Sequence, residues 1–357
     1  MAIPFHGRFV SQKNKKGMVI IMHKLGTELQ ALIEKECKGK THIKLTVGTL
    51  VDGKRTIQTF GASGEVPNEN YVYEIGSITK TFTASLLAKH IHEGKMSLDD
   101  SISKYVDGLD DSYYPTMKRL ATHTAGYGFL PATIREGITM ILLARFIGSR
   151  NGGVMPNALK VDTDKMKKLL LENKKDDKDY PWAYSNFGIG VLGYAIGQAS
   201  GRGYSDTMNE FLINELEMPN SYTGAKPGIN LHGFDKKNKD IGSWDFGKTI
   251  IASAGDISST AEDMLTYAKK HMDVELPYLA LTHQKYTTAR KGISSSGLAW
   301  IMMGENNQII VHNGGTGAFD SLLIIDKQKK LAYVALSNYL INANKLFTTV
   351  LDEMKRL

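Results

Sequence analysis

The sequence has a single cysteine, Cys37, among its 357 residues. One thiol allows no intrachain disulfide and no thiolate metal site. Ten histidines are present, but none belongs to a His-Glu-x-x-His motif, and His90 and His92 point in different directions if this stretch is a helix. We therefore expect no metal site, and nothing in the sequence requires an organic cofactor.

Long hydrophobic runs are also missing. The stretch from Met18 to Met22 follows several lysines, but it is too short for the core of a signal peptide or for a membrane span. We expect a soluble chain without a membrane span, cytoplasmic as the sequence stands or exported if a leader has been removed. The compartment and the oligomeric state stay open.

The positive charges are not segregated along the sequence, although the net charge is +7. Lysines alternate with acidic residues, as in residues 174–179, and such mixed runs are typical of solvated loops. Because the chain has no arginine-rich or aromatic-interleaved patch, we expect no nucleic-acid partner. A hydrophobic fraction of 42% and this length allow a large core, in two lobes or one large domain.

The first stretch with catalytic potential runs from Tyr73 to Phe82, where an extended segment turns through Gly76 into a helix. It places Ser77 and Lys80 three residues apart on one helix face. A serine hydroxyl becomes a nucleophile when a base takes its proton. The positive end of the helix and burial disfavour a charged Lys80, so we expect its pKa to fall and its neutral amine to act as that base.

The Ser-x-x-Lys pattern alone is not decisive, because it occurs twice. The second copy, Ser101 to Lys104, lies in a polar stretch, where we expect a solvated helical turn with a surface lysine. For Ser77, the pattern is equally consistent with a nucleophile and with an ordinary helix-capping serine. The helix after Ser77 has apolar or small residues on most sides, which predicts that it is buried.

The chain has one Tyr-x-Asn motif, Tyr184-Ser185-Asn186, ahead of an apolar stretch that we expect to be a buried helix. A tyrosine near a lysine ammonium loses its proton more easily and can act as a base, and an asparagine amide can donate to and accept from a substrate amide. The alternative is that Tyr184 packs in the core and Asn186 caps the helix. Taken alone, the motif favours that alternative.

Three glycines in the same apolar stretch, Gly188, Gly190 and Gly193, match a dinucleotide-binding pattern. That pattern requires a strand directly before the glycines, whereas Pro181 precedes them and they lie within the expected helix. We therefore reject an NAD-binding oxidoreductase and expect the glycines to permit close packing.

A third motif, His312-Asn313-Gly314-Gly315, follows a strand that ends near Val311. Glycines at the rim of a sheet let a substrate backbone approach, and their N-H groups can bind an oxyanion. His312 could contact a substrate carboxylate. Taken alone, however, the segment favours a plain hairpin connection.

Strand patterns occur toward both ends of the chain. We expect a helix at residues 26–37, a hairpin that turns at Asp52-Gly53, and four strands followed by a closing helix between residues 297 and 354. Residues 98–224 are mostly helical in pattern. This order predicts an α+β fold in which both ends of the chain build one sheet lobe around an inserted helical lobe.

Three short motifs, taken together and in this order, resemble those of the serine β-lactamase and penicillin-binding protein superfamily. They are Ser77-x-x-Lys80, Tyr184-x-Asn186 and His312-x-Gly314. The similarity is greatest to the branch of class C β-lactamases and D-alanyl-D-alanine carboxypeptidases, which also includes esterases and D-aminopeptidases. Residues 120–126, 253–256 and 314–319 resemble family segments too, so the likeness runs from about Leu29 to the C-terminus.

The resemblance implies a role for each motif residue. Ser77 would be the acylated nucleophile, Lys80 and Tyr184 the proton-handling pair, Asn186 the holder of the substrate amide, His312 and Gly314 the substrate edge, and the N-H groups of Ser77 and Gly315 the oxyanion hole. It also implies the β-lactamase/transpeptidase-like fold, an antiparallel sheet flanked by helices plus an all-helical lobe. We assign residues 1–65 and 240–357 to the sheet lobe and residues 66–239 to the helical lobe.

One position departs from the family pattern. Class C β-lactamases usually have lysine where this chain has His312, whereas the carboxypeptidases and esterases often have histidine. A histidine with an ordinary pKa is only partly charged at neutral pH, which weakens a carboxylate anchor.

The resemblance implies a serine hydrolase that acts through an acyl-enzyme on amide or ester bonds, β-lactamase-like or DD-carboxypeptidase-like, with a small-molecule or peptidoglycan-type peptide substrate. The alternatives are a short-chain carboxylesterase or D-aminopeptidase with the same site, and a penicillin-binding sensor without turnover. Loops expected to line the pocket, such as residues 126–156, carry no readable code for the substrate.

Overall fold

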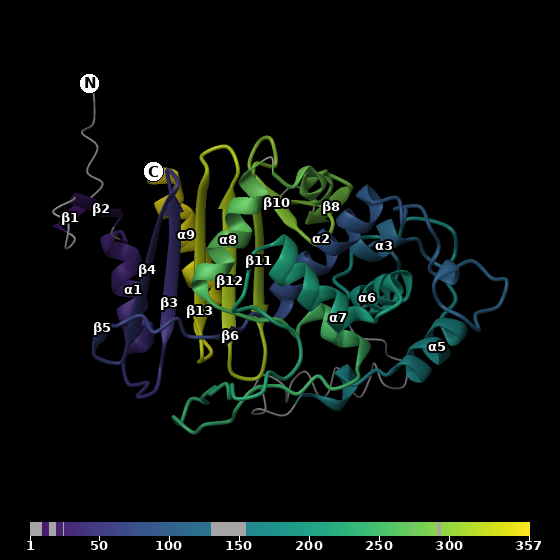
Figure 1. Cartoon of the computed structure of the whole chain (residues 1–357), viewed down its shortest axis with the longest axis horizontal. Coiled ribbons are helices and arrows are strands. Elements are labelled where there is room, and N and C mark those ends of the chain that lie inside the picture. Colours follow the sequence, from purple (N-terminus) through teal and green to yellow (C-terminus); the bar gives the residue numbers. More distant parts are fainter. Residues whose placement is uncertain (1–8, 14–18, 24, 130–154, 274, 291–293) are drawn as a thin grey trace.

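The computed structural model of the protein describes residues 9–13, 19–23, 25–129, 155–273, 275–290 and 294–357. Most of the loop expected at residues 126–156 therefore lies outside the described part. A large antiparallel sheet occupies one side of the molecule and most helices gather on the other side (Figure 1). This arrangement is the predicted α+β fold.

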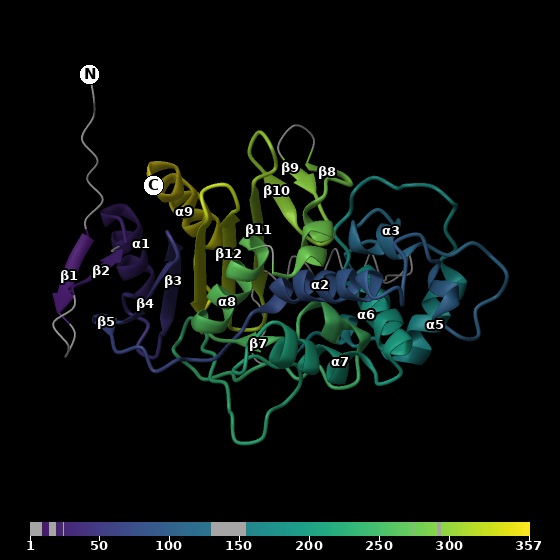
Figure 2. The same cartoon turned by 45° about the horizontal axis from the view of Figure 1, so that its top comes forward.

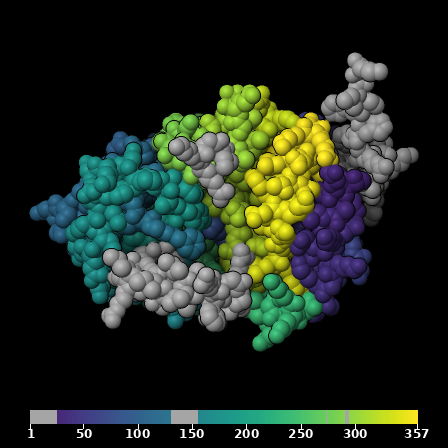
Figure 3. Space-filling model, turned by 180° about the vertical axis from the view of Figure 1, so that it is seen from behind, coloured from purple at the N-terminus to yellow at the C-terminus, as the bar shows by residue number. Residues whose placement is uncertain are grey.

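Among the described residues, the main sheet has nine strands in the order β5-β4-β3-β13-β12-β11-β10-β9-β8. They are β3 (Leu45–Val51), β4 (Lys54–Gly61), β5 (Gly64–Val66), β8 (Thr287–Arg290), β9 (Ser294–Ser296), β10 (Ile301–Met303), β11 (Ile309–Gly315), β12 (Asp320–Asp326) and β13 (Leu331–Ser337). Strand β3 pairs with β13, with Val47 opposite Ala335. Both ends of the chain thus build one sheet, as predicted, and Figure 3 shows them side by side.

Side chains alternate between the two faces of this sheet, and each face has its own core. On β13, Val334 packs in the core that includes helix α8 (Ala261–Met272). The next residue, Ala335, packs in the core formed with helices α1 (Thr27–Cys37) and α9 (Ala343–Arg356). Successive side chains of a strand point to opposite faces of the sheet, and here both faces are buried.

The N-terminal part follows the predicted pattern. Helix α1 occupies the expected residues, and the β3-β4 hairpin turns at Asp52 (φ 50°) and Gly53 (φ 75°). These left-handed conformations suit glycine and are tolerated by aspartate. A separate pair of strands, β1 (Phe9–Lys13) and β2 (Val19–His23), precedes this hairpin.

Helix α2 (Thr79–His92) runs through the helical side of the molecule (Figure 2), and its residues from Thr79 to Ala88 are all buried. The other helices of this side are α3 (Met117–Ala121), α5 (Thr163–Glu172), α6 (Asn186–Ser200) and α7 (Tyr204–Glu210). They all fall within residues 66–239, while the lobe boundaries themselves stay a prediction. No helix among the described residues is long and apolar enough to span a membrane.

The glycines of the rejected dinucleotide pattern lie inside α6, as expected. A Cβ atom at Gly190 would lie 2.9 Å from Ile250, and one at Gly193 would lie 2.2 Å from Ser253. These glycines therefore let the segment 250–254 pack directly on the helix.

Two details differ from the prediction. Strands β8 and β9 were not expected, because their short serine- and threonine-rich sequences show no apolar alternation. The strand expected from Gly297 begins only at Ile301, since a turn with Ala299 at φ 59° precedes it.

The second Ser-x-x-Lys forms a short 3-10 turn in which Lys104 is exposed and pairs with Asp100, as predicted.

Candidate active site

Ser77 lies in a short 3-10 turn, η1 (Gly76–Ile78), between strand β6 (Tyr73–Glu74) and helix α2. Gly76 has φ +49°, a conformation that glycine adopts without strain, and a Cβ there would lie 2.6 Å from the backbone nitrogen of Gly315. The Ser77 side chain is partly exposed. The turn therefore presents the hydroxyl at the surface, directly beside the end of β11.

The sheet holds this turn through close backbone packing. A Cβ at Gly314 would lie 2.0 Å from the carbonyl oxygen of Ile75 and 2.8 Å from the nitrogen of Ser77. The Ser321 hydroxyl on β12 donates to the same Ile75 carbonyl at 2.7 Å. The position of Ser77 is thus set by contacts with two strands.

Lys80 lies one turn of helix beyond Ser77, and its side chain is fully buried. Its Nζ is 2.9 Å from Ser77 Oγ and donates to the carbonyl oxygen of Ala254 at 2.6 Å. Burial holds the pKa of Lys80 well below its ordinary value of 10.5, the direction that we expected. A neutral amine that donates one hydrogen to Ala254 keeps its lone pair for the Ser77 proton.

Tyr184 lies on the other side of the nucleophile. Its hydroxyl shares a hydrogen bond with the Ser77 side chain, and Lys80 Nζ is 4.9 Å from the centre of its ring. Burial raises the pKa of Tyr184 above its ordinary value of 10, while the Ser77 hydrogen bond lowers it by less. The expected easier loss of its proton is therefore not seen, and the phenol is a proton donor at neutral pH.

Asn186 is the first residue of α6, and its N-H donates to the carbonyl oxygen of Phe129 at 3.2 Å. The helix is capped by Ser185 instead, whose hydroxyl accepts from the N-H of Gly188 at 2.9 Å. The alternative in which Asn186 caps the helix is therefore wrong. Its side chain makes no hydrogen bond to the other motif residues within the described part of the chain.

His312 lies on β11, with its ring centre 6.3 Å from that of Tyr184. The side chain is buried, and Nδ1-H donates to the carbonyl oxygen of Asn313 at 2.7 Å. Burial and the nearby Lys80 lower the pKa of His312 to about 3. This histidine is therefore neutral at physiological pH and supplies no cation for a substrate carboxylate.

The N-H group of Gly315 points away from β12. Hydrogen-bonded residues alternate along an antiparallel strand, and Thr316 N-H donates to Phe319 at 3.0 Å. Gly315 therefore directs its N-H to the opposite edge of β11, where β10 pairs only as far as Val311. Since the Ser77 N-H also has no carbonyl partner among the described residues, two N-H groups remain for an oxyanion.

A second histidine, His123, lies beside the motif residues and belongs to none of the three motifs. Its ring centre is 4.9 Å from that of Tyr184. The sequence feature that could have pointed to His123 is its position within residues 120–126. This segment resembles a family segment but contains no known chemical motif.

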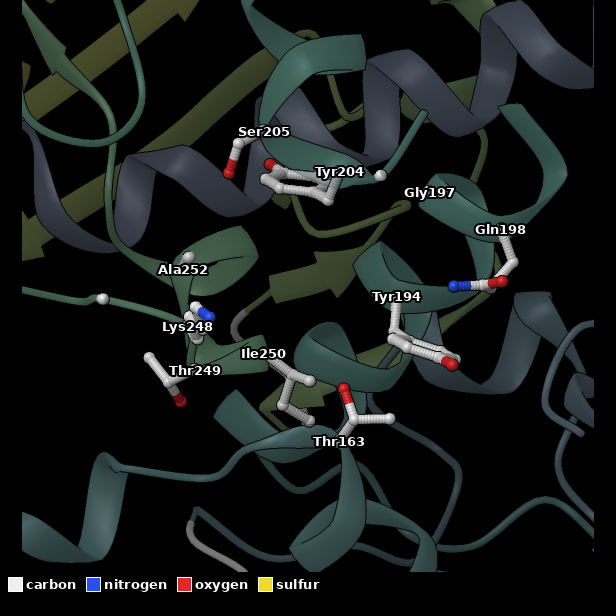
Figure 4. Close-up of a pocket in the computed structure, with 12 residues that line it drawn as sticks. Thr163, Tyr194, Gly197, Gln198, Tyr204, Ser205, Lys248, Thr249, Ile250 and Ala252 are labelled. Atoms are coloured by element: carbon white, nitrogen blue, oxygen red, sulfur yellow. The ribbon is translucent and has the colours of Figure 1, made fainter. Parts of the chain in front are cut away.

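Two cavities lie elsewhere in the molecule. One of about 210 Å³ lies between α6, α7 and residues 247–252 and is lined by Tyr194 and Lys248 (Figure 4). Another of about 490 Å³ is lined by Glu74 and Trp244. Neither is lined by Ser77, so the geometry around the nucleophile, not cavity size, marks the candidate active site.

Comparison with known proteins identifies the family of the chain. A sequence model described as beta-lactamase matches residues 34–348. A beta-lactamase of Providencia stuartii is 25% identical over 239 residues, which are 64% of this chain and 55% of that protein. The chain thus spans just over half of that relative.

Solved structures show the same fold. A class C beta-lactamase mutant superposes with a TM-score of 0.74 at 23% identity, covering 92% of this chain and 96% of that one. The D-alanine carboxypeptidase of Burkholderia cenocepacia gives a TM-score of 0.69 at 19% identity, covering 92% and 98%. With a family match over most of its length, the chain belongs to the beta-lactamase family and has the fold of the class C beta-lactamases.

Proposed function

We propose that the protein is a serine hydrolase that forms an acyl-enzyme at Ser77 and acts on the amide bond of β-lactams or D-amino-acid peptides. The observation that carries the proposal is the 2.9 Å contact between Ser77 Oγ and the fully buried Nζ of Lys80. A nucleophile within hydrogen-bond distance of a neutral base is the arrangement that covalent catalysis requires.

Acylation begins with proton transfer from the Ser77 hydroxyl to the neutral amine of Lys80. The Ser77 oxygen then bonds to the substrate carbonyl carbon, and the carbonyl oxygen becomes negatively charged. The N-H groups of Ser77 and Gly315 stabilise this charge, and each such donor is typically worth about 10²- to 10³-fold in rate.

The leaving group then needs a proton, and Tyr184 supplies it. The phenol is protonated at neutral pH and lies within hydrogen-bond distance of Ser77. As the carbonyl re-forms and the bond between its carbon and the leaving nitrogen or oxygen breaks, the phenol can therefore protonate the leaving atom and regain a proton from the ammonium of Lys80. A water molecule then adds its oxygen to the carbonyl carbon of the ester, the bond from that carbon to the Ser77 oxygen breaks, and Ser77 regains a proton from that water as the acid leaves.

A second candidate, a short-chain carboxylesterase or D-aminopeptidase that uses the same residues, is favoured by the neutral state of His312. Burial keeps this imidazole uncharged, and a substrate carboxylate gains little from a neutral partner. Uncharged esters and amides lose nothing at such a position.

A panel of substrates followed by intact mass spectrometry tests the proposal. The panel contains a chromogenic cephalosporin, a D-alanyl-D-alanine peptide, a D-amino-acid amide and a p-nitrophenyl ester. We expect a transient adduct on Ser77 and release of product with a cephalosporin or a D-amino-acid substrate. Turnover of the simple ester alone favours the esterase, a persistent adduct without product favours a sensor, and no adduct with any compound refutes the proposal.

The rate of acylation is expected to fall as the pH decreases. Only the neutral amine of Lys80 accepts a proton, so below its lowered pKa the rate falls about tenfold per pH unit, and above it the rate is level. The pKa values of His123 and His312 are lowered to about 3. Neither histidine therefore adds an inflection to the pH-rate profile above that pH. Penicillin labelling rates from roughly pH 4 to 10 check this, and a rate that rises as the pH decreases would count against it.

A further inference from the structure

We propose that His123 is a positioning residue, which fixes Tyr184 in the orientation that delivers a proton to the leaving group. The inference rests on the proposed function, because it concerns the same proton transfer. His123 itself lies behind Tyr184 and acts through it.

The backbone of Tyr184 is anchored to His123 on both sides. The N-H of Ala183 donates to the carbonyl oxygen of His123 at 2.9 Å. The N-H of Ser185 donates to Nδ1 of the His123 ring at 3.2 Å. The residues before and after Tyr184 are therefore both held by one amino acid, and the ring provides one of the two hydrogen bonds.

The ring of His123 also packs against the phenol. The ring centres of His123 and Tyr184 lie 4.9 Å apart at an interplanar angle of 35°, and Trp182 meets the imidazole edge-on at 5.8 Å. His123 is only 3% exposed. A buried aromatic contact of this kind restricts the rotation of the Tyr184 side chain.

The hydrogen bond from Ser185 requires a neutral His123, because a protonated ring has no acceptor. Burial, together with the nearby Lys80 and His312, lowers the pKa of His123 to about 3, so the acceptor persists at physiological pH. The backbone of His123 has φ +61°, in the left-handed region, where asparagine, aspartate and histidine are enriched among residues other than glycine. In this conformation the ring lies against the Tyr184 loop, where Nδ1 accepts from the N-H of Ser185.

A displaced phenol affects substrates unequally. An amine leaving group cannot depart without a proton, so amide cleavage depends fully on where Tyr184 lies. A p-nitrophenolate leaving group departs as a stable anion and needs little help. The ratio of amide to p-nitrophenyl ester turnover therefore reports the position of the phenol. A general loss of structure would lower both activities equally and leave this ratio unchanged.

Two variants separate the hydrogen bond from the ring. His123→Phe keeps a ring but removes the acceptor for Ser185, and we expect kcat on the amide to fall about 100-fold, as for a misplaced group. Its kcat on the ester should fall less than about threefold, and both KM values should stay near those of the wild type. His123→Asn places an oxygen close to the position of Nδ1 and tolerates a positive φ, so it should restore most of the amide activity.

A matched control is His90→Phe, because His90 is a buried histidine of α2 that also binds a backbone carbonyl, that of Leu86 at 3.0 Å. This variant should lower stability without changing the amide-to-ester ratio. The ratio does not depend on enzyme concentration, so it can be read even from a poorly folding variant. Equal losses on both substrates in His123→Phe, or no recovery in His123→Asn, would overturn the inference, whereas a wild type that is never acylated would overturn the proposed function instead.

Discussion

Replacing Ser77 by alanine is expected to abolish covalent labelling by a fluorescent penicillin and to reduce kcat/KM by at least about 10⁴-fold, which corresponds to about 5 kcal/mol of transition-state stabilisation. The reason is that no other hydroxyl of the site lies within 2.9 Å of Lys80 Nζ among the described hydrogen bonds. The oxyanion donors and the binding edge remain in the variant, so weak residual catalysis is compatible with the mechanism.

The fold should survive this substitution. Ser77 is partly exposed, and Lys80 keeps its 2.6 Å hydrogen bond to the carbonyl of Ala254. We expect the free energy of unfolding to change by less than about 1 kcal/mol, as is usual for a surface position. A urea titration of the variant checks that the lost labelling does not reflect an unfolded protein.

The matched control is Ser101→Ala, because Ser101 belongs to the second Ser-x-x-Lys. There the Ser101 hydroxyl binds the carbonyl of Tyr114 at 3.2 Å, and Lys104 pairs with Asp100 instead of the serine. This variant should be labelled at the wild-type rate. Labelling of Ser77→Ala at an undiminished rate would show that the nucleophile lies elsewhere.

The pairing of Ser77 and Lys80 could be predicted because it is local. Three residues along a helix bring two side chains to one face, whatever surrounds that helix. The identical spacing at Ser101 and Lys104 shows that spacing alone does not make such a site. The two copies differ in the burial of the lysine and in the group to which the lysine binds. Lys80 is fully buried, whereas Lys104 is exposed. Beforehand, the polar or apolar character of the surrounding residues and the order of distant motifs distinguished them.

The sheet was predictable for a similar reason. Strands β11, β12 and β13 alternate between two apolar faces and are joined by short turns, so pattern and topology agree. Strand β8 forms the edge of the sheet and β9 lies next to it, and the buried residues of β9 are serines, Ser295 and Ser296, which an apolar pattern cannot reveal. Their pairing depends on contacts that no local pattern encodes.

The charge states of the site were predictable only in part. Burial alone lowers the pKa of Lys80, so the helix position was enough for that direction. We expected the lysine to ease deprotonation of Tyr184, but that effect requires an ammonium. The burial that removes the charge of Lys80 also disfavours a phenolate, and the pKa of Tyr184 rises.

His123 escaped the sequence analysis because its role is tertiary. Its contacts with Ala183 and Ser185 join segments about sixty residues apart. The left-handed backbone of His123 carries little sequence signal either, since positive φ is uncommon outside glycine even for histidine, in which it is enriched.

Replacing Gly314 by alanine is expected to damage activity and stability together. The new Cβ would lie 2.0 Å from the carbonyl oxygen of Ile75 and 2.8 Å from the nitrogen of Ser77. Before the atoms fit, the first contact must open by more than about 1 Å and the second by roughly half as much. The turn η1 then moves relative to Gly315, which separates the two oxyanion donors. A displacement of this size costs about 100-fold in the acylation rate constant, and the overpacking about 1 to 3 kcal/mol in the free energy of unfolding.

Gly39→Ala separates this collision from a general effect of losing a glycine. Gly39 has φ +78°, and no atom lies within 4 Å of a Cβ built there, so alanine should cost about 1 kcal/mol of stability through backbone strain alone. The acylation rate constant of that variant should equal the wild-type value. Penicillin labelling gives the acylation rate constants of both variants, and urea titrations give their free energies of unfolding. Together these values show whether the loss of activity comes from the collision. If Gly314→Ala acylates as fast as the wild type, then the close packing of β11 on η1 does not position Ser77, and the two N-H groups do not act as one oxyanion hole.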